Sequence, residues 1–223
     1  MKKLIKADEG EIFDIELATD LLAENERLAK INLELLKKHG VKAIDVLGSV
    51  GSGKTSLLEQ LSQSLKEKYH IAVIGGDLTT TIDTDRIAKH GVDVVQVNTG
   101  KECHLDANLV AKALKEINLT QTDLLFIENV GNLICPAEFP LGSEKRIVVI
   151  SVTEGPFMVV KHPFVFMEAD IVIINKIDLA EAMDVKIKNL EKDVHSINPR
   201  AVVIKTNCRK GEGIDRVIDA LNL

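Results

Sequence analysis

The stretch Gly48-Ser49-Val50-Gly51-Ser52-Gly53-Lys54-Thr55 matches the pattern G-x-x-x-x-G-K-[ST] without a mismatch. A short apolar run, residues 42–47, precedes it, and Leu57, Leu58 and Leu61 follow it at helical spacing. A strand, a glycine-rich loop and a helix in this order form a cradle for phosphate, because backbone N–H groups turn onto the anion and the helix N-terminus attracts it. The stretch therefore predicts a nucleotide phosphate-binding loop (P-loop) rather than a glycine-rich turn that matches by chance.

The chemistry of a P-loop gives two of its side chains specific roles. We expect Lys54 to reach the β and γ phosphates as a catalytic residue, and the Thr55 hydroxyl to ligate Mg²⁺. The predicted phosphate-binding residues are Gly48, Ser49, Val50, Gly51, Ser52, Gly53, Lys54, Thr55 and Ser56.

Length and composition exclude several classes of protein. The chain has 223 residues, 45% of them hydrophobic and 28% charged, which is typical of one large globular domain. A net charge of −6 without a long basic run argues against nucleic acid as the main partner. No apolar run is long enough for a membrane span, and the N-terminus lacks the apolar core of a signal peptide. We therefore expect a cytoplasmic protein.

Short apolar segments alternate with helical patterns along most of the chain. Continuous apolar strands between helices predict an α/β fold of the P-loop NTPase type, with a mostly parallel seven-stranded sheet and helices on both faces. The predicted strands are residues 42–47, 71–76, 92–97, 123–129, 147–152, 170–175 and 201–205. In such a sheet the loops that follow the strands share one edge, where ligands bind.

A helix of about residues 16–39 precedes the P-loop strand, and Gly40 stands at its expected C-terminal cap. Residues 1–40 are thus predicted to be an N-terminal helical extension packed on a nucleotide-binding (G) domain of residues 41–223. The helix either covers one face of the sheet or contacts a partner subunit. Its predicted apolar stripe is Leu17, Leu21, Leu22, Leu28, Ile31, Leu35 and Leu36.

The sixth predicted strand ends in Asn175-Lys176-Ile177-Asp178, which matches the N-K-x-D pattern of GTPases. The Asp178 carboxylate can accept two hydrogen bonds from N1–H and the 2-amino group of guanine, a pair that adenine does not offer. We expect Asn175 to brace the P-loop and the stem of Lys176 to cover the base. The last base-contacting loop of GTPases often reads S-A-K, and the corresponding residues here depart from it: Thr206, Asn207 and Cys208.

Carboxylates near the P-loop are candidates for the magnesium site and for catalysis. Glu128 ends the fourth predicted strand, where it could hold Mg²⁺ directly or through water. Asp77 and Asp83 lie in an acidic, threonine-rich loop of residues 77–85. One of them could ligate Mg²⁺ and the other orient the attacking water. Asp85 is either part of this set or a helix N-terminal residue favoured by the helix dipole.

Cysteine and histidine gather in two of the loops that should share the nucleotide edge. Cys103, His104 and Cys135 each have an ordinary interpretation as packed side chains, but together they suit Zn²⁺ or Ni²⁺. Three ligands leave a tetrahedral site one short, so the set points to a site that is completed by a second copy of the chain. Cys208 lies at the guanine end of the predicted edge, and we interpret it as structural.

Several of these segments together resemble the HypB family, the accessory GTPases for nickel insertion into [NiFe] hydrogenase. The resemblance spans about residues 41–221 and rests on GSVGSGKT, GGDLTTTIDTDRI, NTGKECHLDA, IENVGNLICPAEF, VTEG and INKIDL. Some members add an N-terminal cysteine motif or a histidine-rich tract, and this sequence has neither.

The resemblance implies a protein of the class that contains signal-recognition-particle and nitrogenase-type NTPases. It further implies a homodimer in the GTP-bound state, slow GTP hydrolysis with Mg²⁺, and Zn²⁺ or Ni²⁺ held by Cys103, His104 and Cys135. The implied partners are a HypA-type accessory protein and the hydrogenase large-subunit precursor.

Three other functions remain open from the sequence. A urease-type nickel accessory GTPase shares much of the same frame. A GTP-dependent scaffold would bind metal only incidentally. A small-molecule kinase would share the P-loop, but the N-K-x-D pattern and the scarcity of arginine speak against it.

Overall fold

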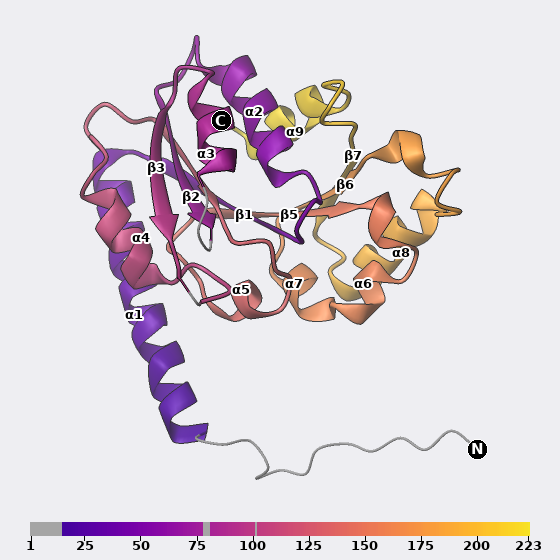
Figure 1. The fold of residues 1–223 in the computed structure, drawn as a ribbon. Helices are drawn as coiled ribbons and strands as arrows, with labels where there is room; N and C mark the ends of the chain where they lie inside the picture. The colour runs from indigo at the N-terminus through magenta and orange to yellow at the C-terminus, as the bar shows by residue number, and fades with distance from the viewer. Residues whose placement is uncertain (1–14, 78–80, 101) are drawn as a thin grey trace.

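The structure is a computed structural model that describes residues 15–77, 81–100 and 102–223. In this part of the chain seven parallel strands form one sheet in the order β3-β2-β4-β1-β5-β6-β7 (Figure 1), which confirms the predicted α/β architecture. The strands are β1 (Lys42–Gly48), β2 (Ile71–Asp77), β3 (Asp93–Asn98), β4 (Leu124–Glu128), β5 (Lys145–Ser151), β6 (Ile171–Asn175) and β7 (Val202–Lys205).

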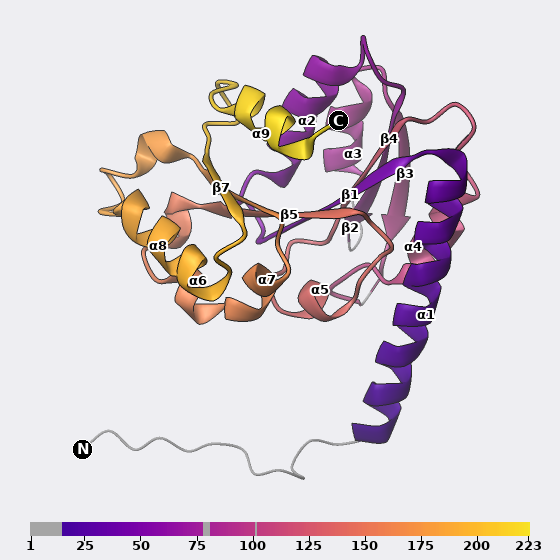
Figure 2. The ribbon, with the colours of Figure 1, turned by 180° about the vertical axis from the view of Figure 1, so that it is seen from behind.

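Helices cover both faces of the sheet. Helices α2, α3 and α9 lie on one face, and α1, α4, α6, α7 and α8 lie on the other, with the short α5 between α4 and α7 (Figures 1 and 2). Their bounds are α1 (Ile15–His39), α2 (Lys54–Leu65), α3 (Ile82–Ala88), α4 (Ala107–Leu114), α5 (Cys135–Glu138), α6 (Met158–Lys161), α7 (Pro163–Met167), α8 (Ile187–Ile197) and α9 (Ile214–Leu221), with the 3-10 turns η1 (Val152–Glu154) and η2 (Ile177–Leu179). None of the described helices is long and apolar enough to cross a membrane.

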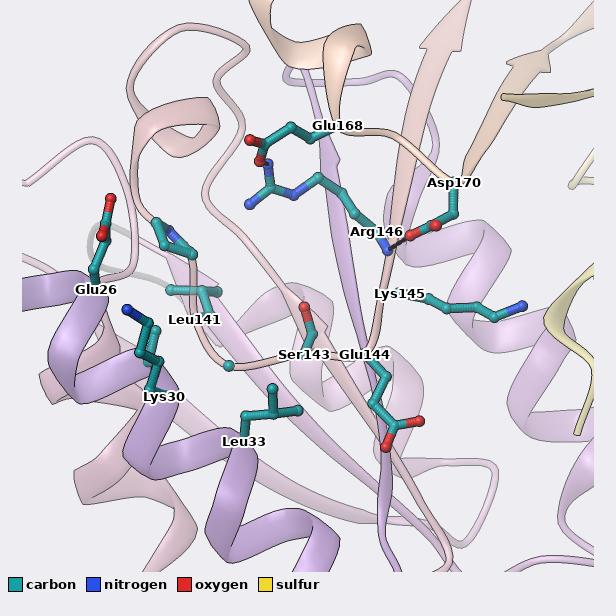
Figure 3. Close-up of a pocket in the computed structure, with 13 residues that line it drawn as sticks. Glu26, Lys30, Leu33, Leu141, Ser143, Glu144, Lys145, Arg146, Glu168 and Asp170 are labelled. Carbon is teal, nitrogen blue, oxygen red and sulfur yellow. Dashed lines mark hydrogen bonds and ion pairs between the residues drawn. The ribbon is translucent and has the colours of Figure 1, made fainter. Parts of the chain in front are cut away.

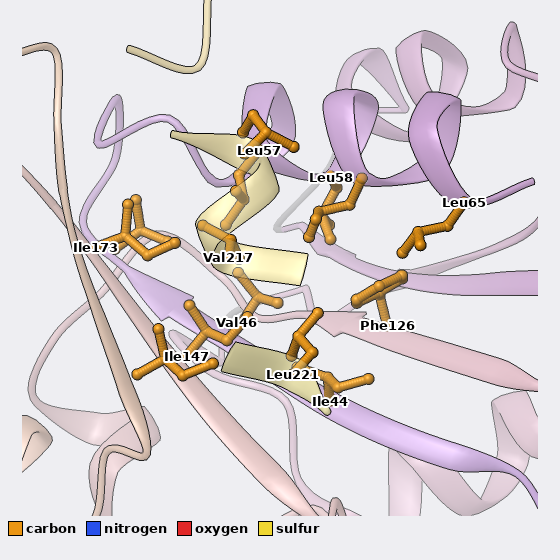
Figure 4. Close-up of a cluster of buried hydrophobic side chains, with 14 of the residues drawn as sticks. Ile44, Val46, Leu57, Leu58, Leu65, Phe126, Ile147, Ile173, Val217 and Leu221 are labelled. Carbon is orange, nitrogen blue, oxygen red and sulfur yellow. The ribbon is translucent and has the colours of Figure 1, made fainter. Parts of the chain in front are cut away.

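Strand β1 is buried on both of its faces from Ala43 onward, which explains why its sequence is apolar apart from Asp45. Ile44 and Val46 point into a cluster with Leu57 and Leu58 of α2 and Val217 of α9 (Figure 4). Ala43 and Leu47, on the other side of β1, join the clusters under the helices of the opposite face. The P-loop therefore leaves the sheet from its central strand.

Helix α1 buries a different face from the one that the apolar stripe predicted. Leu36 is buried as expected, but Leu21, Ile31 and Leu35 are exposed. On the buried face, Asn32 lies one turn before Leu36, and Asn25 lies two turns before Asn32.

Two asparagines explain the orientation of α1. Asn25 donates a hydrogen bond to Pro140 O at 2.9 Å and accepts one from the Ala107 amide at 2.8 Å. Asn32 donates to Ala107 O and to Leu141 O. Buried amide groups need hydrogen-bond partners, so these bonds fix which face of α1 packs on the domain. A pattern of apolar residues does not reveal contacts of this kind.

The predicted acidic loop of residues 77–85 is shorter than expected. Asp77 ends β2 and α3 begins at Ile82, so Asp83 and Asp85 lie in the first turn of a helix. The Thr81 hydroxyl donates to the Asp85 carboxylate at 2.9 Å. Asp85 therefore lies at the N-terminus of a helix, as one of the two alternatives predicted, and it does not line the cavity in front of the P-loop. Residues 78–80 of this loop, and residues 1–14 of the predicted N-terminal extension, lie outside the described residues.

Candidate functional site

The P-loop joins β1 to α2 at the carboxyl edge of the sheet. Gly53 caps α2 with φ of 106°, in the left-handed region that glycine adopts without strain. A Cβ at Gly53 would also collide with the Asn175 amide. The ammonium of Lys54 is buried within the loop and donates to Gly48 O and Ser49 O, both at 3.0 Å. The loop thus has the shape of an anion cradle, with its lysine folded onto the loop's own carbonyls.

A cavity of about 360 Å³ opens in front of this loop. It brings together Lys54, Thr55, Asp77, Asp83 and Glu128, which the sequence placed in three separate segments. Burial lowers the pKa of Lys54, although Glu128, Asp83 and Glu154 act in the opposite direction. The complete lining is Val50, Gly51, Gly53, Lys54, Thr55, Ser56, Gly76, Asp77, Asp83, Arg86, Glu128, Asn129, Gly131 and Lys176.

Glu128 and Thr55 form the innermost contact of the cavity. The Thr55 hydroxyl donates to Glu128 Oε1 at 2.8 Å, across the boundary between α2 and β4. Burial raises the pKa of Glu128 to about 7, against the influence of Lys54 and the Thr55 hydroxyl. The second oxygen, Oε2, is buried and has no hydrogen-bond partner among the described residues. A hydroxyl beside a partly unsatisfied carboxylate fits the oxygen-ligand set that Mg²⁺ prefers.

Arg86 also lines the cavity, and the sequence analysis did not identify it. Its guanidinium donates to Glu59 Oε2 at 2.5 Å and to the Ser56 hydroxyl at 3.1 Å, and it lies 3.4 Å from Asp83 Oδ1. It therefore ties α3 to the P-loop helix and fixes the turn that carries Asp83. The available signal was a lone arginine directly after the threonine-rich segment of residues 77–85, which by itself predicts only a surface charge.

Glu154 is a second acidic group that the sequence analysis missed. It lies in η1 after β5, where its carboxylate accepts from the Ser151 amide at 2.9 Å. Burial raises its pKa, while Lys176 and Lys54 act in the opposite direction. The carboxylate thus contributes negative charge beside the P-loop lysine.

The other end of the P-loop is braced by the N-K-x-D segment. Asn175 donates to Ser52 O at 2.9 Å, and its Oδ1 accepts from the Cys208 amide and the Thr206 hydroxyl. Lys176 donates to Gly51 O at 2.7 Å. Through one amide side chain, β6 and the loop after β7 hold the P-loop in place.

Asp178 and the residues after β7 lie beside this brace. Asp178 is exposed in η2, so its carboxylate is accessible to a base. Thr206, Asn207 and Cys208 are all buried, and Cys208 is only 1% exposed. The bonds of Thr206 and Cys208 go to Asn175, so in this structure they support the loop that Asn175 organises.

The predicted soft-metal residues converge at the same edge. Cys103 and His104 follow β3, and Cys135 begins α5. The two sulfurs are 3.0 Å apart, and Cys103 Sγ lies 3.8 Å from His104 Nδ1. One ligand atom from each of the three residues lies within 4.8 Å of the others. These are separations that a single metal ion can span.

The protonation states of this cluster follow from its contacts. The hydrogen bond to Cys135 raises the pKa of the Cys103 thiol. Burial lowers the pKa of His104, whose ring lies 4.0 Å from that of Phe139 between centroids. A neutral imidazole is the form that binds metal, whereas the thiols must lose protons to do so.

The segment 129–134 connects the two groups of residues. It begins directly after Glu128 and ends directly before Cys135. Its Asn132 forms an isolated antiparallel bridge with Gly48 of the P-loop. Gly131 lies so close to Val50 that a Cβ there would collide with it. These six residues, 129–134, therefore connect the nucleotide cavity to the cysteine cluster.

A larger cavity of about 410 Å³ lies at the opposite, amino edge of the sheet, between α1 and the start of β5 (Figure 3). Arg146 reaches Glu168 there at 3.2 Å and approaches the fully buried Asp45 at 3.5 Å. Burial raises the pKa of Asp45 to about 6, against the influence of Arg146. This cavity lies at the end of the sheet opposite the P-loop, and its lining contains none of the P-loop, cysteine or histidine residues, so it is not the candidate site.

Comparisons with known proteins agree with this geometry. The family model described as "CobW/HypB/UreG, nucleotide-binding domain" matches residues 42–205. The "Probable hydrogenase maturation factor HypB" of Methanocaldococcus jannaschii is 54% identical over 205 residues, which cover 92% of this chain and 93% of that protein. The crystal structure of hydrogenase maturation factor HypB from Archaeoglobus fulgidus is similar with a TM-score of 0.84 at 42% identity, covering 90% of this chain and 98% of that one. The structure of HypB from Helicobacter pylori in complex with nickel gives a TM-score of 0.84 at 35% identity, covering 89% and 94%.

The hydrogen bonds that Asn175 makes to the P-loop and to the loop after β7 generate a prediction. Asn175→Ala should lower the free energy of unfolding by about 1–3 kcal/mol, because the buried Cys208 amide and Thr206 hydroxyl lose their acceptor. Lys176→Ala, which removes a contact at the surface of the same loop, should cost less. Chemical denaturation of both variants measures the difference, and equal losses would contradict the assignment of Asn175 as the main brace.

Proposed function

This chain belongs to the HypB family, and from that premise we propose that it is a GTP-hydrolysing metallochaperone that inserts nickel during maturation of [NiFe] hydrogenase. The observation that carries the proposal is the placement of two sites on one sheet edge. A nucleotide cradle and a cysteine–histidine cluster lie on either side of the segment 129–134, which contacts the P-loop at Gly48. In a protein with this arrangement, the affinity for a soft metal ion can depend on which nucleotide is bound.

The proposed nucleotide is GTP. Asp178 would select guanine through its exposed carboxylate, and Asn175 and Lys176 already contact the loop that would enclose the phosphates. Phosphate oxygens would replace the loop carbonyls as partners of the Lys54 ammonium. Because Lys54 is buried, its charge would act on the γ phosphate with little screening by water.

A magnesium ion is the proposed partner of the phosphates. Thr55 and Glu128 are the residues that would hold it, together with Asp77 or Asp83, and it would supply neutralisation of the charge on the phosphates. The remaining aspartate of that pair would orient the attacking water. Arg86 would keep the Asp83 turn against the P-loop helix through its bonds to Ser56 and Glu59.

The proposed metal cargo is nickel, with Zn²⁺ as the competing ion. Cys103, His104 and Cys135 supply two sulfurs and one nitrogen, a donor set suited to both ions. Three donors leave coordination incomplete, so we propose that GTP brings two chains together at this edge. A HypA-type accessory protein and the hydrogenase large-subunit precursor are the proposed partners in the transfer of nickel.

Hydrogenase maturation is favoured over the other functions by particular observations. The Methanocaldococcus jannaschii relative, which is 54% identical, is described as a probable hydrogenase maturation factor, and this favours hydrogenase over a urease-type role. Two exposed or half-buried sulfurs beside an imidazole weigh against a scaffold whose cysteines merely pack. A kinase would need an acceptor pocket, whereas carboxylates and the P-loop itself line the cavity before Lys54.

Base selection is tested at Asp178. Asp178→Asn should weaken GTP binding and improve binding of xanthosine triphosphate, because the 2-oxo group of xanthine requires a donor where guanine requires an acceptor. Asp184→Asn, in the following turn, is the matched control and should change neither affinity. Titration with fluorescent analogues of both nucleotides measures the effect. An unchanged GTP affinity in Asp178→Asn would rule out this carboxylate as the guanine reader.

The metal cargo and the dimer are tested together. With a non-hydrolysable GTP analogue and Ni²⁺ or Zn²⁺, sedimentation velocity should show a dimer that carries stoichiometric metal. His104→Ala should lose metal at the same protein concentration, whereas His195→Ala, at an exposed position on α8, should retain it. Metal retained at the same level by both variants would place the cargo elsewhere.

A further inference from the structure

The two cysteines of the cluster are arranged as a reactive pair as well as a pair of ligands. The Cys103 thiol donates directly to the Cys135 sulfur at 3.0 Å. A disulfide requires about 2.05 Å, so the sulfurs would have to approach by only about 1 Å. Cys103 is exposed and Cys135 is partly exposed, so small oxidants can reach both.

One asparagine holds the two cysteine-bearing segments together. The side chain of Asn132 donates to Cys103 O at 3.4 Å and accepts from the Ile134 amide at 3.0 Å, next to Cys135. Asn129 adds a second tie, because its Oδ1 accepts from the amides of Leu105 and Val130. These hydrogen bonds between asparagine side chains and the backbone therefore hold the two sulfurs close together, independently of any bound metal.

We propose that Cys103 and Cys135 form a reversible oxidation site, in which a hydroperoxide converts the pair to an intrachain disulfide. The more exposed sulfur, that of Cys103, attacks the peroxide oxygen, which gives a sulfenic acid and releases one molecule of water or alcohol. The Cys135 sulfur then attacks the sulfenic sulfur and expels water. Two thiols lose two electrons and two protons in total, and the hydroperoxide takes up both.

The disulfide removes two of the three soft ligands. Only His104 remains, and a single imidazole does not hold nickel or zinc in competition with water and cellular thiols. Bound metal and the disulfide are thus mutually exclusive states of the same two sulfurs. This consequence rests on the proposed function, whereas formation of the disulfide does not.

Cys208 provides an internal reference for the experiment. The chain has three cysteines, and the Cys208 thiol is buried at the opposite end of the P-loop. The metal-free full-length protein is treated with hydrogen peroxide and unfolded, and its thiols are then counted. We expect three thiols to fall to one and to return with dithiothreitol, while peptide mapping shows a Cys103–Cys135 link.

Zinc alone serves as the probe of the connection to metal. Zn²⁺ at about 100 times its Kd should slow the oxidation about 100-fold, because only the metal-free fraction reacts. His104→Ala should still form the disulfide but should lose most of this protection. Cys135→Ser should form no intrachain link, and Asn132→Ala should form it more slowly than the wild type.

The outcomes separate the two proposals. A wild-type protein that takes up Zn²⁺ but yields only sulfinic acid or intermolecular disulfides would overturn the oxidation site and leave the metallochaperone intact. A disulfide that forms at the same rate with and without Zn²⁺ would overturn the exclusion between the two states and count against the proposed metal site.

Discussion

The hydrogen bond between the Thr55 hydroxyl and Glu128 is the contact on which the arrangement of this edge depends. It joins the first turn of the P-loop helix to the last residue of β4, at 2.8 Å and away from solvent. Parallel pairing of β1 with β4 sets its register, because Val46 lies opposite Glu128. From Glu128 the chain runs along the P-loop to Cys135, so the position of this carboxylate also sets where the cysteine segment begins.

Two different kinds of ligand chemistry lie on either side of that contact. The nucleotide side offers carboxylate and hydroxyl oxygens, which suit a hard cation beside phosphates. The cysteine side offers two sulfurs and an imidazole, which suit a soft or borderline cation. A few residues of backbone separate the two sets, yet their donor types keep each from binding the other's ion well. Selectivity between the two proposed metal ions would thus follow from the donor types of the two sets, without a barrier between the sites.

The local patterns of the sequence predicted most of the fold and most of the candidate residues at the carboxyl edge of the sheet. The P-loop, the N-K-x-D segment and the apolar strands are contiguous in sequence, so their geometry follows from a few neighbouring residues. The rule that loops after parallel strands share an edge then placed Glu128 and Cys135 near Lys54. The structure brings these residues to one edge, while their roles in binding and catalysis stay proposals.

The features that sequence reasoning missed depend on long-range polar contacts. Asn25 and Asn32 turn α1 away from its apparent apolar stripe because they bond to backbone from β4–β5 and α4 segments. Arg86 acquires its place only when α3 packs on α2, and Glu154 only when η1 packs beside the P-loop. The separation of the two sulfurs is likewise set by Asn132, whose side chain has no signal in a pattern of residue types.

The central claim is that the nucleotide and metal sites are energetically coupled through Glu128 and the segment that follows it. The most direct measurement is a Zn²⁺ titration of the full-length protein with and without a non-hydrolysable GTP analogue, paired with titration of the analogue with and without Zn²⁺. Coupling predicts that the analogue lowers the Kd for Zn²⁺, and that Zn²⁺ lowers the Kd for the analogue by the same factor. A Kd for Zn²⁺ that is identical in the two nucleotide states would contradict it.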